Sequence, residues 1–259
     1  MTTTILKLEN VFKSFGGLTA VSNFSLKLDK AEIQGIIGPN GAGKTTVFNL
    51  ITGVYQPDKG NIQLDTATIS NLPADAIARA GIARTFQNIR LFGEMTVLDN
   101  IKMAFHCRTG YRFWDTLIHS SRFRKMEAKI RDESLEYLNC LGLADRYQEL
   151  AKNLPYGEQR RLEIARALAA EPKVLLLDEP AAGMNPREVE NLIGLIKRIH
   201  RDFSLSILLI EHQMPVVLEL CHFIQVMDFG QTIASGAPQE VTNDPQVIRA
   251  YLGEEEIAL

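Results

Sequence analysis

The amino-acid sequence predicts an α/β fold with a parallel core sheet, an antiparallel β subdomain and an inserted helical subdomain. Compact apolar runs rich in Ile, Leu and Val suit parallel strands that are covered on both faces. Three such runs occupy residues 33–37, 174–177 and 207–210. Strand patterns disappear between about residues 90 and 155, where apolar residues recur at helical spacing. The sequence therefore predicts a sheet-based core that is interrupted by a helical insertion.

Alternating apolar and polar residues predict the antiparallel subdomain. Residues 5–8, 24–28 and 61–64 show the period of two that is typical of half-buried strands. In the helical insert, the apolar positions stop before Gly142, a residue that favours the end of a helix. These apolar positions are Met126, Ile130, Tyr137, Leu138 and Leu141. A short terminal helix is expected after Asn243-Asp-Pro245, with Val247, Ile248, Tyr251 and Leu252 as its apolar positions.

The composition is that of an ordinary globular protein. Of the 259 residues, 46% are hydrophobic and 23% are charged. The formal net charge of −3 gives no basic surface for nucleic acid, so no nucleic-acid partner is expected. Every apolar run is much shorter than the roughly 18 to 20 residues of a membrane helix. Because the N-terminus lacks a secretion signal, we expect a cytoplasmic protein.

Two minor features have structural interpretations. Cys107, Cys140 and Cys221 are scattered and lack CxxC spacing, so we expect reduced packing residues rather than metal ligands or disulfide partners. The stretch 108–124 interleaves basic residues with aromatics and is not a clean basic tract. We expect a locally packed helical excursion there, and a partner-facing or membrane-proximal surface is the alternative. The aromatics are Tyr111, Phe113, Trp114 and Phe123.

A Gly-rich stretch lies between the first apolar run and a helix expected over residues 45–51. Its residues are Gly38, Pro39, Asn40, Gly41, Ala42, Gly43, Lys44, Thr45 and Thr46. This spacing matches a P-loop, in which backbone N–H groups curl around phosphates. Lys44 can then reach the β- and γ-phosphates, and the Thr45 hydroxyl can ligate Mg²⁺. The sequence thus predicts a P-loop NTPase with a RecA-like core.

An acidic pair ends the second apolar run. Asp178 and Glu179 follow the strand predicted at 174–177. Asp178 lies 134 residues after Lys44 in the sequence. By itself such a pair is usually a solvated turn. In a P-loop protein, however, this strand runs beside the nucleotide strand, so Asp178 can hold Mg²⁺ and Glu179 can polarise the attacking water. The pair is therefore a predicted metal ligand and catalytic base.

A third motif, Leu154-Pro-Tyr-Gly-Glu158, leads into an evident helix before the acidic strand. Together these motifs resemble the ABC-transporter ATPases, whose Leu-Ser-Gly-Gly-Gln signature corresponds to this segment. The resemblance covers nearly the whole chain and implies ATP and Mg²⁺ as cofactors. It also implies a single ABC ATPase domain over residues 1–259. Its expected parts are an antiparallel β layer with the P-loop (1–88), a helical signature subdomain (89–160) and the rest of the core with the C-terminal helix (161–259).

The resemblance implies several further site residues. Gln87 corresponds to the Q-loop glutamine, a ligand of Mg²⁺ or its water, and His212 corresponds to the switch histidine at the γ-phosphate. Alone, either residue would be an ordinary loop or packing residue. Phe15 is the expected adenine-stacking aromatic, and Phe12 competes for that role. Nucleotide contacts from the signature are expected at Tyr156, Gly157 and Glu158.

Two residues depart from the family pattern. Pro155 stands where the signature has a serine, so it offers neither a hydroxyl nor an N–H to the γ-phosphate. Its fixed φ suits the start of a helix, whose N–H groups can still address a phosphate. Asn185 replaces a common aspartate in the D-loop at 181–185. We expect Pro155 to weaken the ATP-bound assembly without abolishing it. Asn185 places an amide where the family has a charge, which leaves the contribution of the D-loop to communication open.

Several segments are most similar to the ATPases of branched-chain amino acid importers. They occupy residues 14–18, 84–92, 156–166, 179–186 and 249–253. The resemblance implies a homo- or heterodimer with a second ABC ATPase, because the P-loop of one subunit and the signature of the other close over the same ATP. It also implies permease subunits, an extracytoplasmic amino-acid-binding protein and a peripheral position on the cytoplasmic face of the inner or plasma membrane.

Three rival interpretations stay open at this point. A soluble ABC ATPase of translation or DNA repair usually has tandem cassettes, a coiled-coil insertion or a basic surface, which this chain lacks. The ATPase of an exporter, such as a lipopolysaccharide-export subunit, shares the overall plan. A regulatory module without useful turnover is suggested by Pro155 and Asn185. A GTPase is disfavoured because no Asn-Lys-x-Asp motif is present.

Overall fold

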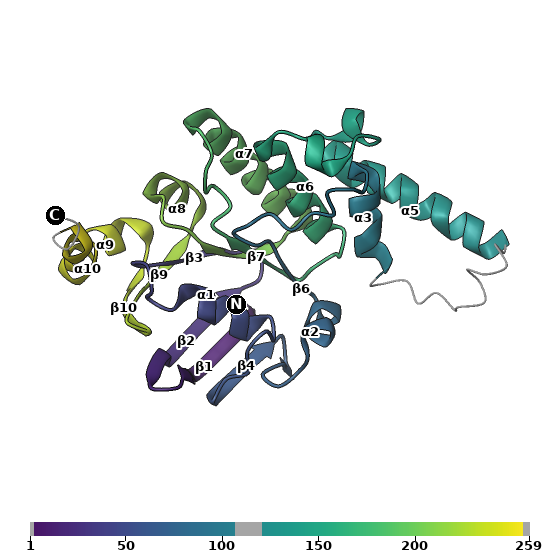
Figure 1. Ribbon diagram of the computed structural model, residues 1–259. Coiled ribbons are helices and arrows are strands. Elements are labelled where there is room, and N and C mark those ends of the chain that lie inside the picture. Colours follow the sequence, from purple (N-terminus) through teal and green to yellow (C-terminus); the bar gives the residue numbers. More distant parts are fainter. Residues whose placement is uncertain (1–2, 107–120, 256–259) are drawn as a thin grey trace. The chain divides into compact units, whose positions relative to one another are not determined.

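The computed structural model describes residues 3–106 and 121–255, which belong to two compact units (Figure 1). The first unit combines Met1–Arg84 with Lys173–Leu259, and the second is Thr85–Pro172. Residues 108–120 of the stretch of basic and aromatic residues lie outside the described residues. The same is true of Cys107 and of the side chain of Phe123.

A six-stranded core sheet forms the centre of the first unit, in the order β10-β9-β3-β8-β7-β6. Its neighbouring strands are parallel except for the β9–β10 pair. Every residue of β3, β7 and β8 is buried, which explains their unbroken apolar sequences. The strands are β3 (Ile33–Ile37), β6 (Ile82–Arg84), β7 (Val174–Asp178), β8 (Ser206–Ile210), β9 (Phe223–Asp228) and β10 (Gln231–Gly236).

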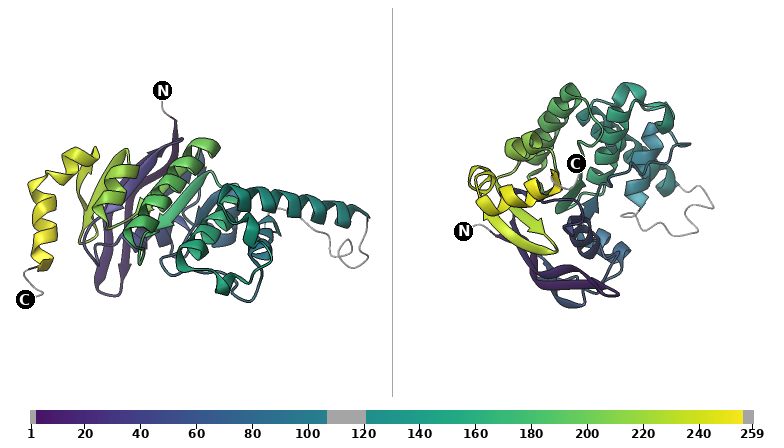
Figure 2. Two further views of the ribbon diagram at one scale, coloured as in Figure 1. Left: turned by 90° about the horizontal axis from the view of Figure 1, so that it is seen from above. Right: turned by 60° about the vertical axis from the view of Figure 1, so that its left-hand side comes forward.

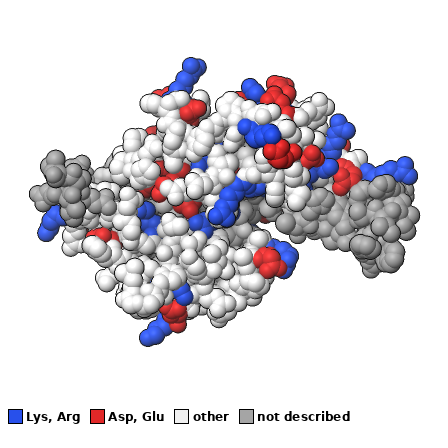
Figure 3. Space-filling view, in the orientation of Figure 1, with Lys and Arg blue, Asp and Glu red and all other residues white. Residues whose placement is uncertain are grey.

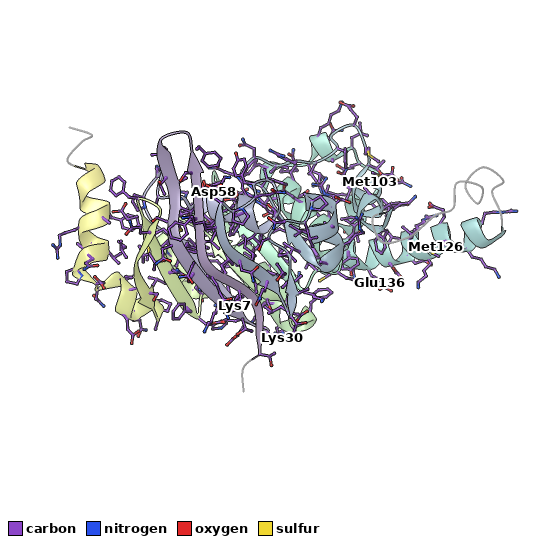
Figure 4. All side chains as sticks on the ribbon, turned by 90° about the horizontal axis from the view of Figure 1, so that it is seen from below. Lys7, Lys30, Asp58, Met103, Met126 and Glu136 are labelled. Carbon is purple, nitrogen blue, oxygen red and sulfur yellow. The ribbon has the colours of Figure 1, made fainter. Side chains whose placement is uncertain are left out.

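The predicted antiparallel layer is a separate four-stranded sheet in the same unit, in the order β2-β1-β4-β5. Its strands are β1 (Thr4–Phe15), β2 (Leu18–Asp29), β4 (Lys59–Leu64) and β5 (Ala67–Thr68). Phe24, Leu26 and Leu28 of β2 are buried, whereas the residues between them are exposed, as the alternating sequence predicts. Asp58 and Lys30 lie toward opposite ends of this sheet (Figure 4).

Helices complete the first unit. The helix α1 follows β3 and begins at Lys44, within the Gly-rich stretch. Its Val47, Phe48 and Ile51 belong to a buried cluster that includes residues of both sheets. The C-terminal helices α9 and α10, which follow the β9–β10 hairpin, are the yellow elements of Figure 2. The helix bounds are α1 (Lys44–Ile51), α2 (Ala74–Ala80), α7 (Pro186–Phe203), α8 (Met214–Leu220), α9 (Pro238–Thr242) and α10 (Pro245–Glu255).

The second unit is helical within its described residues. Its elements are α3 (Val97–His106), α5 (Ser121–Cys140), the 3₁₀ helices η1 (Ala144–Arg146) and η2 (Ala151–Asn153), and α6 (Tyr156–Leu168). Ile130, Leu138 and Leu141 are buried, and Met126 and Tyr137 are half-buried, which confirms the apolar positions predicted for this segment. Gly142, with φ +68°, follows the end of α5 as expected.

The surface of the described residues carries both signs of charge. Lys and Arg are interspersed with Asp and Glu on the face drawn in Figure 3. None of the described helices combines the length and the apolar character that are needed to cross a bilayer.

Candidate nucleotide-binding site

The Gly-rich loop connects β3 to α1 and is shaped by glycines that no larger residue can replace. Gly38 and Gly43 have φ values of +145° and +99°. A Cβ on Gly38 would lie 2.0 Å from the Met227 carbonyl oxygen, and one on Gly43 would lie 2.3 Å from the Ala20 carbonyl oxygen. The backbone of the first unit therefore encloses the loop so closely that side chains are excluded here.

Lys44 lies at the first position of α1 and reaches back over the loop. It is 6% exposed, and its Nζ donates to the carbonyl oxygens of Gly38 at 2.5 Å and Pro39 at 2.8 Å. The first N–H groups of a helix have no intrahelical acceptor, so the start of α1 provides donors for an anion. A buried ammonium beside these N–H groups is suited to binding phosphate oxygens.

The strand β7 ends with Asp178 at the same edge of the core sheet. Asp178 pairs in register with Ile210, the last residue of β8, which in turn lies beside β3. Its carboxylate is buried and accepts a hydrogen bond from Arg84 Nη2 at 2.6 Å. Arg84 Nη1 also donates to Asn49 Oδ1 of α1 at 2.7 Å. The sequence prediction missed Arg84, because only the fold brings the end of β6 beside the end of β7.

Glu179 and His212 are close together, as the motifs predict. Glu179 Oε2 lies 3.7 Å from His212 Nδ1, and the exposed fractions of the two side chains are 15% and 53%. Glu179 has φ +46°, an uncommon conformation for a residue with a side chain. Its N–H donates to the Ile210 carbonyl oxygen at 2.9 Å. This conformation turns the chain sharply after β7 and brings the carboxylate to the histidine.

Phe15 is accessible at the end of β1. Its ring is 40% exposed and meets Tyr55 edge to face, with ring centroids 5.0 Å apart. Lys13 Nζ lies 5.4 Å from the centroid of the Phe15 ring. Phe12 is half-buried within the same strand. The exposed Phe15 ring is therefore the more accessible of the two candidates, and its stacking role stays a prediction.

The signature segment begins α6 in the second unit. Pro155 is the N-cap residue, and its carbonyl oxygen accepts from the N–H groups of Glu158 and Gln159 at 2.9 Å. Tyr156 is 43% exposed. The Glu158 carboxylate pairs with Arg146 at 3.0 Å and with Arg161 at 3.5 Å. The proline thus lies at the N-cap of α6, one position before the first helical position that its fixed φ favours.

Gln87 belongs to the same unit and is connected to α6 by a fully buried arginine. Arg160 donates to the carbonyl oxygens of Phe86 at 2.6 Å and Gln87 at 2.7 Å. It also pairs with Glu163 at 2.8 Å, and the Glu163 carboxylate accepts from the N–H of Arg90 at 3.2 Å. The loop that carries Gln87 is therefore held by the helix that carries the signature. Sequence reasoning missed both charged residues, because burial is not visible in their residue types.

The oxygen ligands of the first unit fit a magnesium ion. Mg²⁺ usually takes one or two carboxylates and completes its shell with phosphates and water. The Asp178 carboxylate and the Thr45 hydroxyl offer oxygen donors of the kind that this hard cation prefers. Among the described residues there is no cluster of three or more His, Cys, Asp or Glu that could hold a metal alone.

The family model described as "ABC transporter" matches residues 21–182, which include the loop, the signature and the acidic pair. The chain belongs to the ABC transporter family. A second model, "Branched-chain amino acid ATP-binding cassette transporter", matches residues 231–257 of this ABC transporter ATPase.

Individual ABC proteins match over all or nearly all of their lengths. The high-affinity branched-chain amino acid transport ATP-binding protein LivG of Salmonella typhimurium is 45% identical, over 98% of this chain and 100% of the relative. The lipopolysaccharide export system ATP-binding protein LptB of Haemophilus influenzae is 38% identical, over 97% and 98% respectively. The crystal structure of the ADP conformation of MJ1267, an ATP-binding cassette of an ABC transporter, has 32% sequence identity to this chain and a TM-score of 0.85. The match covers 97% of this chain and 100% of that one. The ABC cassette fold predicted from the sequence is thereby confirmed.

Proposed function

We propose that this chain hydrolyses ATP to drive an importer of branched-chain or other neutral amino acids. The observation that carries the ATPase part is the meeting of the Gly-rich loop, Asp178, Glu179 and His212 at one edge of the core sheet. The importer part is supported by the 45% identity to LivG and by the second family model.

The chemistry follows from the charges at this edge. Lys44 and the N–H groups that begin α1 hold the phosphates, since both are donors directed at the loop. Mg²⁺, when bound, neutralises phosphate charge and makes the γ-phosphorus more electrophilic. Thr45 and Asp178 would hold that ion. Glu179 accepts the proton of the attacking water, and His212 donates to a γ-phosphate oxygen.

A second ATPase subunit completes the site in this proposal. The signature residues Tyr156, Gly157 and Glu158 would address the ATP held by the loop of the other subunit. Pro155 supplies no hydroxyl there, so the N–H groups at the start of α6 carry the phosphate contact. A hydrogen bond to a charged group contributes roughly 1.5–3 kcal/mol, so the loss of one weakens the closed dimer without abolishing it.

The ATPase is tested with purified full-length chain and Glu179→Gln. The glutamine keeps the size of the side chain and cannot accept the water proton, so we expect ATP binding within about twofold of wild type and a decrease in kcat of at least about 100-fold. Phosphate release and the binding of a fluorescent ATP analogue are measured in parallel. Unchanged phosphate release in the variant would remove Glu179 from the role of base.

The exporter interpretation keeps one supporting observation, the 38% identity to LptB. It shares the ATPase chemistry and differs in the membrane partners. Affinity purification from native membranes separates the two proposals, because an importer copurifies with permeases and depends on an extracytoplasmic binding protein. Copurification with lipopolysaccharide-export subunits would instead favour the exporter.

A further inference from the structure

Glu211 is a buried carboxylate for which the proposed chemistry has no use. It lies between β8 and His212, and its exposed fraction is 0%. Burial raises its pKa above the ordinary value, although hydrogen bonds from the N–H groups of Ala181, Gln213 and His212 act in the opposite direction. A buried carboxylate lowers stability unless it is well hydrogen-bonded. Its hydrogen bonds therefore indicate what this residue does.

These hydrogen bonds join two segments of the candidate site. Glu211 Oε1 accepts from the N–H of Ala181 at 2.9 Å. Its Oε2 accepts from the N–H groups of His212 at 3.0 Å and Gln213 at 3.2 Å. In the reverse direction, Gln213 Nε2 donates to the Ala181 carbonyl oxygen at 3.0 Å. We call this set of four hydrogen bonds the loop clamp.

The loop clamp holds the backbone on both sides of the Glu179–His212 pair. Ala181 is two residues after Glu179, whose own N–H is bonded to the Ile210 carbonyl oxygen at 2.9 Å. The N–H of His212 donates a hydrogen bond to the side-chain carboxylate of Glu211. We propose that Glu211 is a positioning residue that sets the separation of the Glu179 carboxylate and the His212 imidazole. This inference rests on the proposed catalytic roles of those two residues.

The chemistry of the clamp requires a carboxylate. Three N–H donors converge on two oxygens, and an ionised carboxylate presents acceptors only. A glutamine of the same shape has one oxygen and one NH₂ group. Its NH₂ group would face a backbone N–H of the clamp, so two donors would meet without an acceptor. The segment that carries Ala181 or the one that carries His212 must then shift. Because catalytic geometry is sensitive to displacements of about 1 Å, such a shift can lower the rate by about 100-fold.

The test uses the full-length chain and two variants that open the clamp at different points. In Glu211→Gln we expect kcat for ATP hydrolysis to decrease about 10- to 100-fold, with KM for ATP within about twofold of wild type. Gln213→Ala removes only the side-chain bond to Ala181 and should decrease kcat by a smaller factor, about 3- to 10-fold. The double variant should be less impaired than the product of the two factors, because both residues act on one element.

Gln225→Met is the matched control. Gln225 is another buried residue of this unit that ties elements together, since its Nε2 donates to the Ser25 carbonyl oxygen at 2.9 Å and to Thr232 Oγ1 at 2.6 Å. It contacts no proposed catalytic residue in the described bonds. We expect this variant to lower Tm and to leave kcat within about twofold of wild type. A decrease in kcat that simply follows Tm across all variants would make Glu211 a structural residue and overturn the proposal.

The remaining outcomes also decide the question. If wild type hydrolyses ATP, Glu179→Gln does not, and both clamp variants keep wild-type kcat, the positioning role is overturned while the ATPase proposal stands. If Glu211→Gln does not fold, Gln213→Ala decides by itself: reduced kcat at unchanged Tm supports the clamp, and unchanged kcat overturns it. If Glu179→Gln retains full activity, Glu179 is not the base and this inference fails with that role, while ATP hydrolysis by the chain stands. If wild type does not hydrolyse ATP, the proposed function itself fails.

Discussion

Single residues in the candidate site are held by pairing buried charges with specific partners. Arg84 and Asp178 are each about 5% exposed and lie 2.6 Å apart, so neither charge is left without a counter-charge away from water. Removing one member of a buried pair costs about 3–5 kcal/mol because the other stays buried and unpaired. Arg84 thereby holds the Asp178 carboxylate in a fixed orientation.

Cys221 supports a prediction at the same scale. Burial, together with the nearby charge of Glu211, raises the pKa of the Cys221 thiol to about 12. At pH 8 the reactive thiolate is then about one part in 10⁴. We expect Cys221 of the native chain to resist labelling by maleimide at pH 8. The labelling rate should rise about tenfold per pH unit while the fold persists. In denaturant, where the thiol is exposed, labelling should be rapid.

Mass spectrometry of peptides from pulse-labelled protein measures this rate for Cys221. Cys140, which is half-buried, provides the internal comparison. Labelling of native Cys221 as fast as Cys140 at pH 8 would contradict the buried, protonated thiol.

The residues of the site differ in how far the sequence could identify them. Lys44, Asp178 and Glu179 belong to motifs whose spacing encodes their neighbours in the fold. Arg84 and Glu211 are isolated charges, and their partners at positions 178 and 181 are distant in the sequence. Long-range pairing of this kind depends on strand order, which one sequence without its fold does not specify.

At the scale of elements, Asn185 has a structural explanation. It caps α7, where its Oδ1 accepts from the N–H of Glu188 at 3.0 Å and its own N–H donates to Glu188 Oε2 at 3.0 Å. This reciprocal pair is a capping box, followed by a proline at the first helical position. Asparagine and aspartate are about equally good caps, so the departure from the family pattern leaves α7 intact.

We therefore predict that Asn185→Ala lowers the free energy of unfolding by about 1 kcal/mol, because the alanine leaves the N–H of Glu188 without its acceptor. Asn185→Asp is the matched control and should stay within a few tenths of a kcal/mol. Urea unfolding followed by circular dichroism measures both values. Equal stability of Asn185→Ala and wild type would show that the capping box does not contribute.

The prediction of elements succeeded where residue patterns were long and regular. The all-buried strands β3, β7 and β8 were recognisable as apolar runs, and the apolar positions of α5 followed helical spacing. Strand β6 was missed because three residues carry no period, and its pairing with β7 supplies the order that the local sequence lacks. Strand β9 was missed because the polar Gln225 interrupts its buried apolar run. Strand β10 was missed because all of its residues are half-buried or exposed, which weakens alternation.

At the scale of the whole molecule, the proposed mechanism assigns the chain halves of two different ATP sites. The first unit holds the loop, the acidic pair and His212, and the second unit holds Gln87 and the signature at the start of α6. In the proposed mechanism these halves operate on the ATP molecules of a dimer. In this proposal ATP binding would close the pair, hydrolysis would open it, and the second unit would transmit that cycle to membrane subunits.

The central claim is that ATP hydrolysis by this chain drives the uptake of neutral amino acids. The most direct measurement is ATP turnover by the complex that copurifies with the tagged chain from membranes, reconstituted in vesicles with its binding protein. We predict that leucine, isoleucine or valine stimulates phosphate release several-fold, and that Glu179→Gln abolishes the stimulated rate. ATP turnover that ignores these amino acids, in a complex without permease subunits, would contradict the account.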